Sequence, residues 1–189
     1  MAKSKNNIIT HGLSGKVGDI LVFRQRAGQT IVSKVPVQSG ELTENQKAVN
    51  RKFQQAVIYA KASLADASLK KAAYAAEAEG AQTGYNIAIA DFFHAPDISE
   101  VDFSAYAGQP GDKIKIRVSD NFMVKEVRVA IMNSDGTIAD QGIAANDING
   151  LDWIFTATEA NPSLEGDKII ITATDNPDNK AVKEQLLAG

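Results

Sequence analysis

The 189-residue chain carries a net charge of −3 at neutral pH, contains no cysteine and has two histidines. The missing cysteines exclude disulfides, thiolate metal sites and a cysteine nucleophile. No segment approaches the roughly 18 apolar residues that a membrane-spanning helix needs, so we expect no membrane span. The basic N-terminus is not followed by an apolar run of signal-peptide length, which predicts cytoplasmic synthesis without a signal peptide. The final location stays open, and an extracellular or particle-associated one would need a non-classical route.

The two halves of the sequence differ in the sign of their charge. Residues 1–96 contain 12 Lys and Arg against 7 Asp and Glu, a net charge of +5, whereas residues 97–189 contain 8 against 16, a net charge of −8. Such a separation is typical of two solvated domains with different ancestry. It also suits a surface that meets acidic partners, including the acidic half of a neighbouring copy. Both interpretations remain open at this point.

A glycine-rich segment at residues 12–19 leads into two β-branched runs, residues 20–26 and 30–35, which a short loop containing Gly28 separates. Two such runs around a short glycine loop predict a β-hairpin. Pro36 ends the second strand, because proline cannot donate a hydrogen bond to a neighbouring strand. A lone hairpin is marginal in water, so we expect this one to pack on the following helices or on another subunit.

Three helices are predicted next. Residues 43–46, Thr-Glu-Asn-Gln, form a capping box, in which the threonine and glutamine side chains each accept a backbone N–H of the first turn. The helix that it opens has apolar residues at helical spacing, namely Val49, Phe53, Ala56, Val57, Ala60 and Leu64. Alanine-rich helices follow at residues 69–79, with Asp66 or Ser68 as the cap, and at residues 85–93, before Pro96. The many alanines predict a compact three-helix unit.

After Pro96 the apolar pattern changes to a period of two. Strands are predicted at residues 113–118, 124–131, 137–139, 152–158 and 168–173, with a turn at residues 133–136. Several short strands separated by turns indicate a β-sandwich, with Trp153 as its core anchor. Residues 179–189 are expected to form a final helical turn or two.

The predicted fold class is therefore α+β. Residues 1–96 form a β-hairpin and an alanine-rich helical unit, residues 97–178 an immunoglobulin-like antiparallel β-sandwich, and residues 179–189 a C-terminal tail. The immunoglobulin-like assignment concerns the general architecture, because the Cys…Trp…Cys spacing of antibody domains is absent.

Residues with catalytic chemistry are few. The histidines His11 and His94 lie in the glycine-rich segment and beside a helix-ending proline, without a carboxylate constellation around either. We interpret them as surface or helix-end residues. The run from Gly12 to Lys16 has the wrong spacing for a phosphate-binding loop, and Val17 stands where a serine or threonine belongs. We therefore predict no catalytic residue, no cofactor and no enzyme activity.

Aspartates gather at the predicted turns of the sandwich, where their oxygens would suit Ca²⁺. They are Asp112, Asp120, Asp135, Asp175 and Asp178. None follows the spacing of an EF-hand loop, and aspartate also populates turns because it tolerates left-handed backbone geometry. We favour turn chemistry over calcium and predict no metal site.

Lysines and arginines form a candidate surface for assembly or binding. Its members are Lys16, Arg24, Arg26, Lys34, Arg51 and Lys52. On an exposed hairpin, such residues normally protect strand edges from unwanted pairing. They would also suit the phosphates of a nucleic acid, with Phe23 and Tyr59 as neighbouring aromatic groups, although no known nucleic-acid module emerges.

The run at residues 12–25, GLSGKVGDILVFRQ, resembles the N-terminal region of a family of uncharacterised bacterial proteins. That region opens with a Ser-Gly-Lys-Val-Gly element, followed by a hairpin, a proline, and a helix with glutamine and arginine before a phenylalanine. The matching residues here are Pro36, Gln46, Arg51 and Phe53. The resemblance covers the N-terminal third and implies no activity. The C-terminal half is similar to bacterial immunoglobulin-like modules, which implies a role in adhesion or assembly.

These observations predict a non-catalytic structural subunit that self-assembles, as a component of a filament, a sheath or a particle. A head-to-tail contact that does not close yields an open polymer, and strand addition at a sheet edge is a natural joint. The expected partner is another copy, in a homo-oligomer or polymer, and no small-molecule substrate is inferred. The alternative is a binding module that uses the basic N-terminal half to hold a nucleic acid or another acidic partner.

Overall fold

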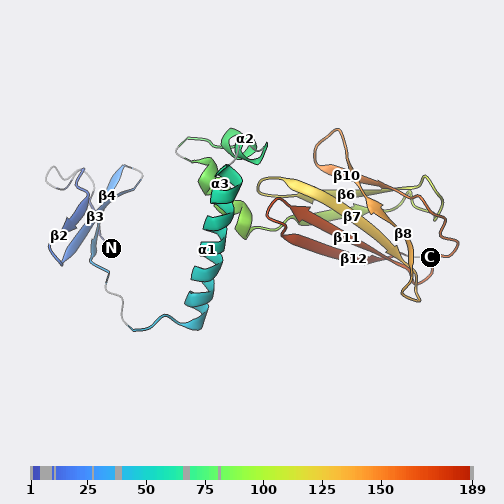
Figure 1. Ribbon diagram of the computed structural model, residues 1–189, viewed down its shortest axis with the longest axis horizontal. Helices are drawn as coiled ribbons and strands as arrows, with labels where there is room; N and C mark the ends of the chain where they lie inside the picture. Colours follow the sequence, from blue (N-terminus) through green and yellow to red (C-terminus); the bar gives the residue numbers. More distant parts are fainter. Residues whose placement is uncertain are drawn as a thin grey trace. The chain divides into compact units, whose positions relative to one another are not determined.

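The computed structural model describes residues 2–4, 10, 12–26, 28–36, 40–65, 69–80 and 82–187. These residues form helices and antiparallel sheets, which confirms the α+β class. They group into two compact units, Met1–Lys47 and Ala48–Gly189 (Figure 1). The boundary that the sequence predicts at Pro96 lies inside the second unit, and a division into separate domains at that point stays a prediction.

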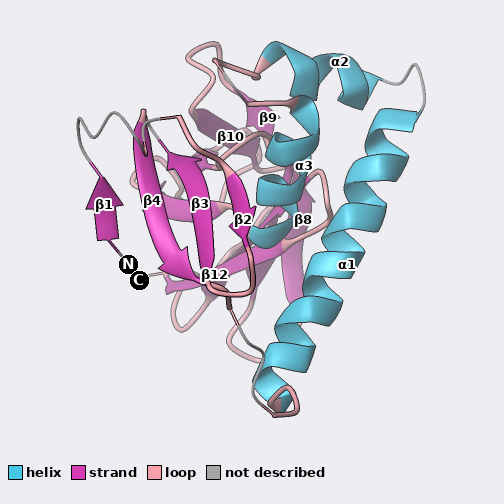
Figure 2. Cartoon of the chain, turned by 90° about the vertical axis from the view of Figure 1, so that its left-hand side faces the viewer, coloured by secondary structure: helices cyan, strands magenta, loops and turns pink. Residues whose placement is uncertain are grey.

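The described strands of the first unit form one sheet. They are β1 (Ala2–Ser4), β2 (Gly15–Val17), β3 (Leu21–Arg26) and β4 (Gln29–Lys34), in the order β1-β4-β3-β2. Figure 2 shows β4, β3 and β2 side by side. The predicted hairpin consists of β3 and β4, with Leu21 opposite Lys34 at one end and Arg26 opposite Gln29 at the other. Gly28 in its loop has a φ of +71°, which glycine adopts without steric cost.

The three predicted helices are present among the described residues. They are α1 (Glu44–Ala65), α2 (Leu69–Ala76) and α3 (Gly84–Phe93). The capping box is confirmed, because the Thr43 N–H donates to Gln46 Oε1 at 2.9 Å and the Gln46 N–H donates to Thr43 Oγ1 at 3.3 Å. Asp66 and Ser68, the predicted caps of α2, lie outside the described residues, as does His11. No described helix has the length and apolar character needed to cross a membrane.

One residue from each helix joins a small buried cluster in the second unit. Ala60 of α1, Tyr74 of α2 and Ala88 of α3 are fully buried together. Tyr74 also stacks on Phe122, which belongs to the loop between the strands at residues 113–119 and 124–132, with the ring centroids 4.2 Å apart. The helical core therefore continues into a loop of the β-structure.

Eight strands of the second unit form two four-stranded antiparallel sheets. One sheet has the order β5 (Asp97–Asp102), β6 (Lys113–Ser119), β10 (Asp152–Thr156) and β9 (Ala145–Asn146). The other has the order β12 (Lys180–Leu186), β11 (Lys168–Asp175), β7 (Val124–Met132) and β8 (Ile138–Ile143).

The two sheets share one hydrophobic core. Ile114 and Ile116 of β6 are fully buried and alternate with exposed residues, and Ile169 and Ile171 of β11 are fully buried in the same cluster. Trp153 belongs to this core, as the sequence predicts. Each fully buried aliphatic side chain stabilises the fold by about 1.5–3 kcal/mol, so this core is a main source of stability in the unit.

A lysine joins the edges of the two sheets. Lys183 of β12 donates from Nζ to the carbonyl oxygens of Ile98 and Ser99 on β5, at 3.0 Å in both cases. The register of β5 shifts between Ile98 and Glu100, which leaves Ser99 as a bulge. The bulge leaves carbonyl oxygens outside the regular ladder, and the ammonium group satisfies them.

The helical prediction for the C-terminal tail is wrong. Residues Lys180 to Leu186 form strand β12, which pairs with β11 over its whole length, from Lys180 opposite Thr174 to Leu186 opposite Lys168. The local sequence contains good helix formers, but their preference for a helix is worth only about a few tenths of a kcal/mol per residue. Hydrogen bonding to β11 along the whole strand outweighs this preference.

Gly108 offers a test of the fold. It has a φ of +82°, and a Cβ added there would lie 2.2 Å from the carbonyl oxygen of Asn161. We expect Gly108→Ala to lower the free energy of unfolding by about 2–4 kcal/mol, from backbone strain and from this clash. Gly111→Ala is the matched control, because Gly111 has a φ of +96° with nothing within 4 Å, and about 1 kcal/mol is expected. Equal losses in urea denaturation would contradict the packing at Gly108.

Candidate functional site

The register of the first sheet collects three basic residues on one face. Directly opposed residues of paired strands point to the same side, and alternate residues of one strand do so too. Lys16 lies opposite Val22, and Val22, Arg24 and Arg26 alternate along β3. We call Lys16, Arg24 and Arg26 the basic face. All three are exposed.

The opposite side of this sheet carries apolar residues, Val17, Leu21, Phe23 and Val32, which we call the apolar face. Val17 is 57% exposed, and the other three are partly exposed. Neither hydrophobic core cluster of the described residues includes a member of the first unit. The basic face also carries two partly exposed apolar residues, Val22 and Ile31, so the two sides of the sheet differ more in charge than in apolar character. The apolar face is partly exposed and contributes to neither core cluster of the described residues.

Hydrogen bonds of Gln25 connect the segment around Leu13 to one end of the apolar side. Gln25 donates from Nε2 to Thr30 Oγ1 at 2.8 Å and to the Leu13 carbonyl oxygen at 2.7 Å. Thr30 is 2% exposed. These bonds fix the segment around Leu13 to the β3–β4 hairpin, which gives the small sheet a defined shape in spite of its thin core.

The other predicted surface residues do not join the basic face. Lys34 lies opposite Leu21 and so projects on the apolar side. Arg51 and Lys52 belong to α1 in the second unit, and Lys52 Nζ lies 5.2 Å from the centroid of the Phe93 ring. The sequence places all six basic residues in one candidate surface, whereas the strand register shows that only three of them share one side of the sheet. Lys16 also pairs with Asp19 at 2.5 Å, but both side chains are exposed and such a pair contributes little.

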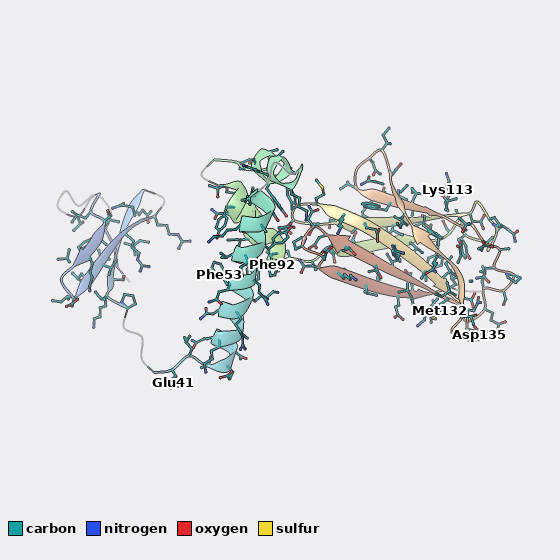
Figure 3. All side chains as sticks on the ribbon, in the orientation of Figure 1. Glu41, Phe53, Phe92, Lys113, Met132 and Asp135 are labelled. Atoms are coloured by element: carbon teal, nitrogen blue, oxygen red, sulfur yellow. The ribbon has the colours of Figure 1, made fainter. Side chains whose placement is uncertain are left out.

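The first turns of α1 expose part of the predicted apolar stripe. Ala56 and Ala60 are fully buried, whereas Val49 is 64% exposed and Phe53 is 49% exposed. The ring centroids of Phe53 and Phe93 of α3 lie 6.4 Å apart in a stacked arrangement. Figure 3 labels Phe53 on α1 and Phe92, the residue before Phe93, on α3. The stripe is therefore packed at its C-terminal end and open at its N-terminal end, which the periodicity of the sequence does not reveal.

A charged cluster covers the outer side of β6 and β10. Asp152 is 1% exposed and accepts from Arg117 Nε at 2.9 Å, from Lys115 Nζ at 3.0 Å and from Asn149 Nδ2 at 2.6 Å. Hydrogen bonds from Arg117 and Lys115 hold the pKa of Asp152 well below its usual range. A carboxylate that is locked in its ionised form stabilises structure and is a poor proton donor or base.

A second group of carboxylates lies where the helices meet the sandwich. Asp91 of α3, Asp120 of the β6–β7 loop and Asp175 of β11 each place an oxygen within 4.8 Å of the others. Asp91 and Asp175 are fully buried. Oxygen ligands in such a group are the kind that Ca²⁺ and Mg²⁺ prefer. We call these three residues the carboxylate cluster.

Burial raises the pKa of Asp91 to about 6, with the charges of Asp120 and Asp175 acting in the same direction and a hydrogen bond from Tyr74 opposing them. Burial also raises the pKa of Asp175, against hydrogen bonds from Asn179. The cluster therefore concentrates negative charge in a place where water does little to stabilise it.

The predicted turn chemistry is present at the aspartates of the sandwich. Asp112 Oδ2 accepts the N–H groups of Ala107 and Gln109 at 2.8 and 2.9 Å, and Asp135 Oδ1 accepts the N–H of Thr137 at 2.9 Å. The N–H groups of Gln109 and Ala107 lower the pKa of Asp112, and the hydroxyl and N–H of Thr137 lower the pKa of Asp135. Turn chemistry does not account for the convergence of Asp120 and Asp175.

Asp91 is the member of the cluster that the pattern of turn aspartates in the sequence does not include. It lies on α3, far in sequence from the turn aspartates, so spacing gives no hint of the cluster. One signal in the sequence points to it: an aspartate in the otherwise apolar run Ile87 to Phe93 has no obvious reason to be there.

Comparison of the chain with protein-family models, with curated proteins and with solved structures finds no match. The resemblances of the N-terminal third and of the C-terminal half therefore stay predictions. The chemistry and exposure of the described residues carry the functional conclusion.

The charged cluster predicts a pH effect on stability. Because the pKa of Asp152 is lowered in the folded state, its contribution to stability is present above the pKa of the unfolded chain, about 3.9, and is lost as the pH falls through the folded value. We expect Asp152→Asn to lower the free energy of unfolding at neutral pH and to flatten its decline in acid, as measured by urea denaturation across pH. Glu165→Gln, at an exposed position, is the control. Parallel pH curves for Asp152→Asn and the unaltered protein would disprove this role.

Proposed function

We propose that this chain is a non-catalytic structural subunit whose copies assemble through the sheet of the first unit. The observation that carries the proposal is the apolar face, whose residues, above all Val17, stay partly exposed among the described residues of that unit. A sheet with one apolar side is stable when that side is buried against another layer. Full burial of an exposed apolar side chain contributes about 1.5–3 kcal/mol, and Val17, at 57% exposure, would gain roughly half of that, so a contact that covers the face is favoured.

A second copy of the chain is the partner that the charges favour. The first 96 residues carry +5 and the rest carry −8, so copies attract when the basic half of one meets the acidic half of the next. In this arrangement the apolar face supplies affinity, and the basic face sets orientation and the rate of encounter. A head-to-tail contact of this kind extends into a filament or sheath unless rotation closes it into a ring.

The charged groups of the second unit suit structure better than catalysis. Asp152 is held ionised by Arg117 and Lys115. His94 lies at the end of α3, where its Nδ1 is 2.7 Å from the carbonyl oxygen of Ala90. Both arrangements satisfy local hydrogen bonds and present no activated nucleophile or base.

An immunoglobulin-like identity of the two-sheet structure is part of the proposal. With β5, β6, β7, β8, β10, β11 and β12 taken in chain order as strands A, B, C, D, E, F and G, one sheet contains A, B and E and the other contains G, F, C and D. Immunoglobulin-type sandwiches keep A, B and E apart from C, F and G, while the fourth strand varies between types. The strand order supports this identity, and such modules serve well as spacers and joints in assemblies.

The alternative is a binding module for a nucleic acid or another acidic partner. The exposed cations of the basic face favour it, since Arg24 and Arg26 form no ion pair with a described residue. Phe23, however, lies on the apolar face, opposite the cations, so the described basic face offers no aromatic platform for stacked bases. Self-assembly accounts for both faces of the sheet, whereas nucleic-acid binding accounts for one.

The apolar face gives the first test. We expect Val17→Lys to weaken self-association at least about tenfold, because the change places a charge in the contact. Sedimentation velocity over a range of concentrations measures the effect, with circular dichroism to show that the variant is folded. Val182→Lys is the matched control, since Val182 is a strand valine with a similar exposure of 61%. A monomer at all concentrations, or equal behaviour of both variants, would refute the proposal.

The basic face gives the second test. Reversal of Arg24 and Arg26 to Glu is expected to weaken self-association about tenfold at low salt and much less at high salt, because screening removes the attraction between copies. Retention of the unaltered protein on immobilised DNA, lost in the same variant while the sedimentation of the two proteins stays identical, would instead support the nucleic-acid alternative.

A further inference from the structure

The carboxylate cluster brings together three segments that are far apart in sequence. Asp91 comes from α3, Asp120 from the β6–β7 loop and Asp175 from the end of β11, and one oxygen of each lies within 4.8 Å of the others. All three belong to the second unit, so the geometry does not depend on the first.

Two oxygens of the cluster have no hydrogen-bond partner among the described residues. Asp91 is 0% exposed, and its Oδ1 is buried and accepts no hydrogen bond. Asp120 Oδ1 is also buried without a partner. Buried polar atoms are nearly always satisfied in native proteins, because an unsatisfied one costs about 1–3 kcal/mol and a charged one costs more. Two such oxygens in one group of carboxylates indicate a missing positive ligand.

The lysine whose charge acts on Asp91 does not fill this role. Lys70 donates from Nζ to the carbonyl oxygen of Asn176 at 3.4 Å and lies 5.6 Å from the centroid of the Tyr59 ring. It forms no ion pair with a described carboxylate of the cluster. The negative charge of the three aspartates is therefore not balanced by a direct contact with a side-chain cation.

We propose that Asp91, Asp120 and Asp175 bind a Ca²⁺ ion. The donor set is made of oxygen, which suits hard cations and not zinc or copper. The three oxygens lie within 4.8 Å of one another, which is close enough to surround one such cation. The number of carboxylates favours Ca²⁺, because Mg²⁺ usually keeps several waters and is held by only one or two carboxylates. The remaining coordination positions would be taken by water and nearby carbonyl oxygens.

Neighbouring groups already orient the three ligands. Tyr74 donates its hydroxyl to Asp91 Oδ2 at 2.5 Å, and the Met123 N–H donates to Asp120 Oδ2 at 3.2 Å. Asn179 donates its N–H to Asp175 Oδ1 at 2.6 Å and its Nδ2 to Asp175 Oδ2 at 2.7 Å. In both Asp91 and Asp120 one oxygen is held and the other is left bare, an arrangement that typically positions a carboxylate for a metal.

The ion would fasten the helical part of the second unit to the sandwich. Without it, the junction depends on the stacking of Tyr74 on Phe122 and on the Asn179 side chain, which donates to the His94 carbonyl oxygen at 2.9 Å. With Ca²⁺ bound, α3, the β6–β7 loop and β11 share one centre. The calcium site thus acts as a brace within the subunit, and it stands whether or not the proposed self-assembly is correct.

Calcium binding by the full chain tests the proposal. After treatment with EDTA and transfer to metal-free buffer near neutral pH, CaCl₂ is expected to bind with a stoichiometry of one and a Kd of about 10⁻⁵ to 10⁻³ M in isothermal titration calorimetry. At a hundredfold excess over Kd, the Tm should rise by about 5–10 °C. MgCl₂ at the same concentration should raise the Tm by less than about half of the shift that CaCl₂ produces, because Mg²⁺ gives up its bound water reluctantly.

Two substitutions separate metal binding from structure. Asp91→Asn places an amide N–H beside the bare oxygens, so this variant is expected to be folded and as stable as the unaltered protein in EDTA, with no response to CaCl₂. Asp120→Asn, at a partly buried position, is expected to weaken calcium binding at least about tenfold. Asp135→Asn is the matched control, because Asp135 is a turn aspartate outside the cluster and the variant should keep the full calcium response.

Two results would refute the proposed calcium site. The absence of both binding heat and a Tm shift at millimolar CaCl₂ would refute the site and would assign the balancing charge to a proton on Asp91. An unchanged calcium response in Asp91→Asn and Asp120→Asn would place calcium binding elsewhere and would also refute it.

Discussion

Burial of an apolar sheet face is the main stabilising interaction of this molecule, and its two units achieve that burial to different extents. In the second unit, alternate residues of β6 and β11 point into one core, where Ile114 and Ile171 are fully buried. In the first unit, Val17 stays 57% exposed, and no described residue of that unit belongs to either core cluster. The proposed assembly follows from this difference, because an apolar sheet face without an internal partner is most stable against an external one.

At the junction between the helices and the sandwich, the main energetic cost is the burial of negative charge and not the exposure of apolar surface. The alanines of α1 and α3 and the ring of Phe122 make a small apolar contact, yet three aspartates converge beside it. Native proteins tolerate concentrated buried charge where it has a purpose, since replacement by apolar residues would be easier to accommodate. A cation at the cluster would replace the repulsion among the three carboxylates with their attraction to one shared ion, and would so stabilise the junction.

Local patterns predicted much of the fold. The hairpin, the capping box at Thr43 and the strands of the sandwich all follow from periodicity and turn residues that act over a few positions. The tail was predicted wrongly, because the helix propensity of its sequence gave way to pairing with β11. The carboxylate cluster was out of reach, since Asp91, Asp120 and Asp175 meet only through the packing of three distant segments. The basic face falls between these cases: its members were identified, but only the register of β2, β3 and β4 shows which of them share a side.

The contact of Lys183 with the bulge at Ser99 has a consequence for the edge of the sheet to which β5 belongs. An ammonium group on two carbonyl oxygens occupies the acceptors that an incoming β-strand would need along that flank. A strand from another chain would therefore have to displace this lysine before it could pair with β5 along its full length. Lys183 thus helps to protect the β5 edge from unwanted pairing.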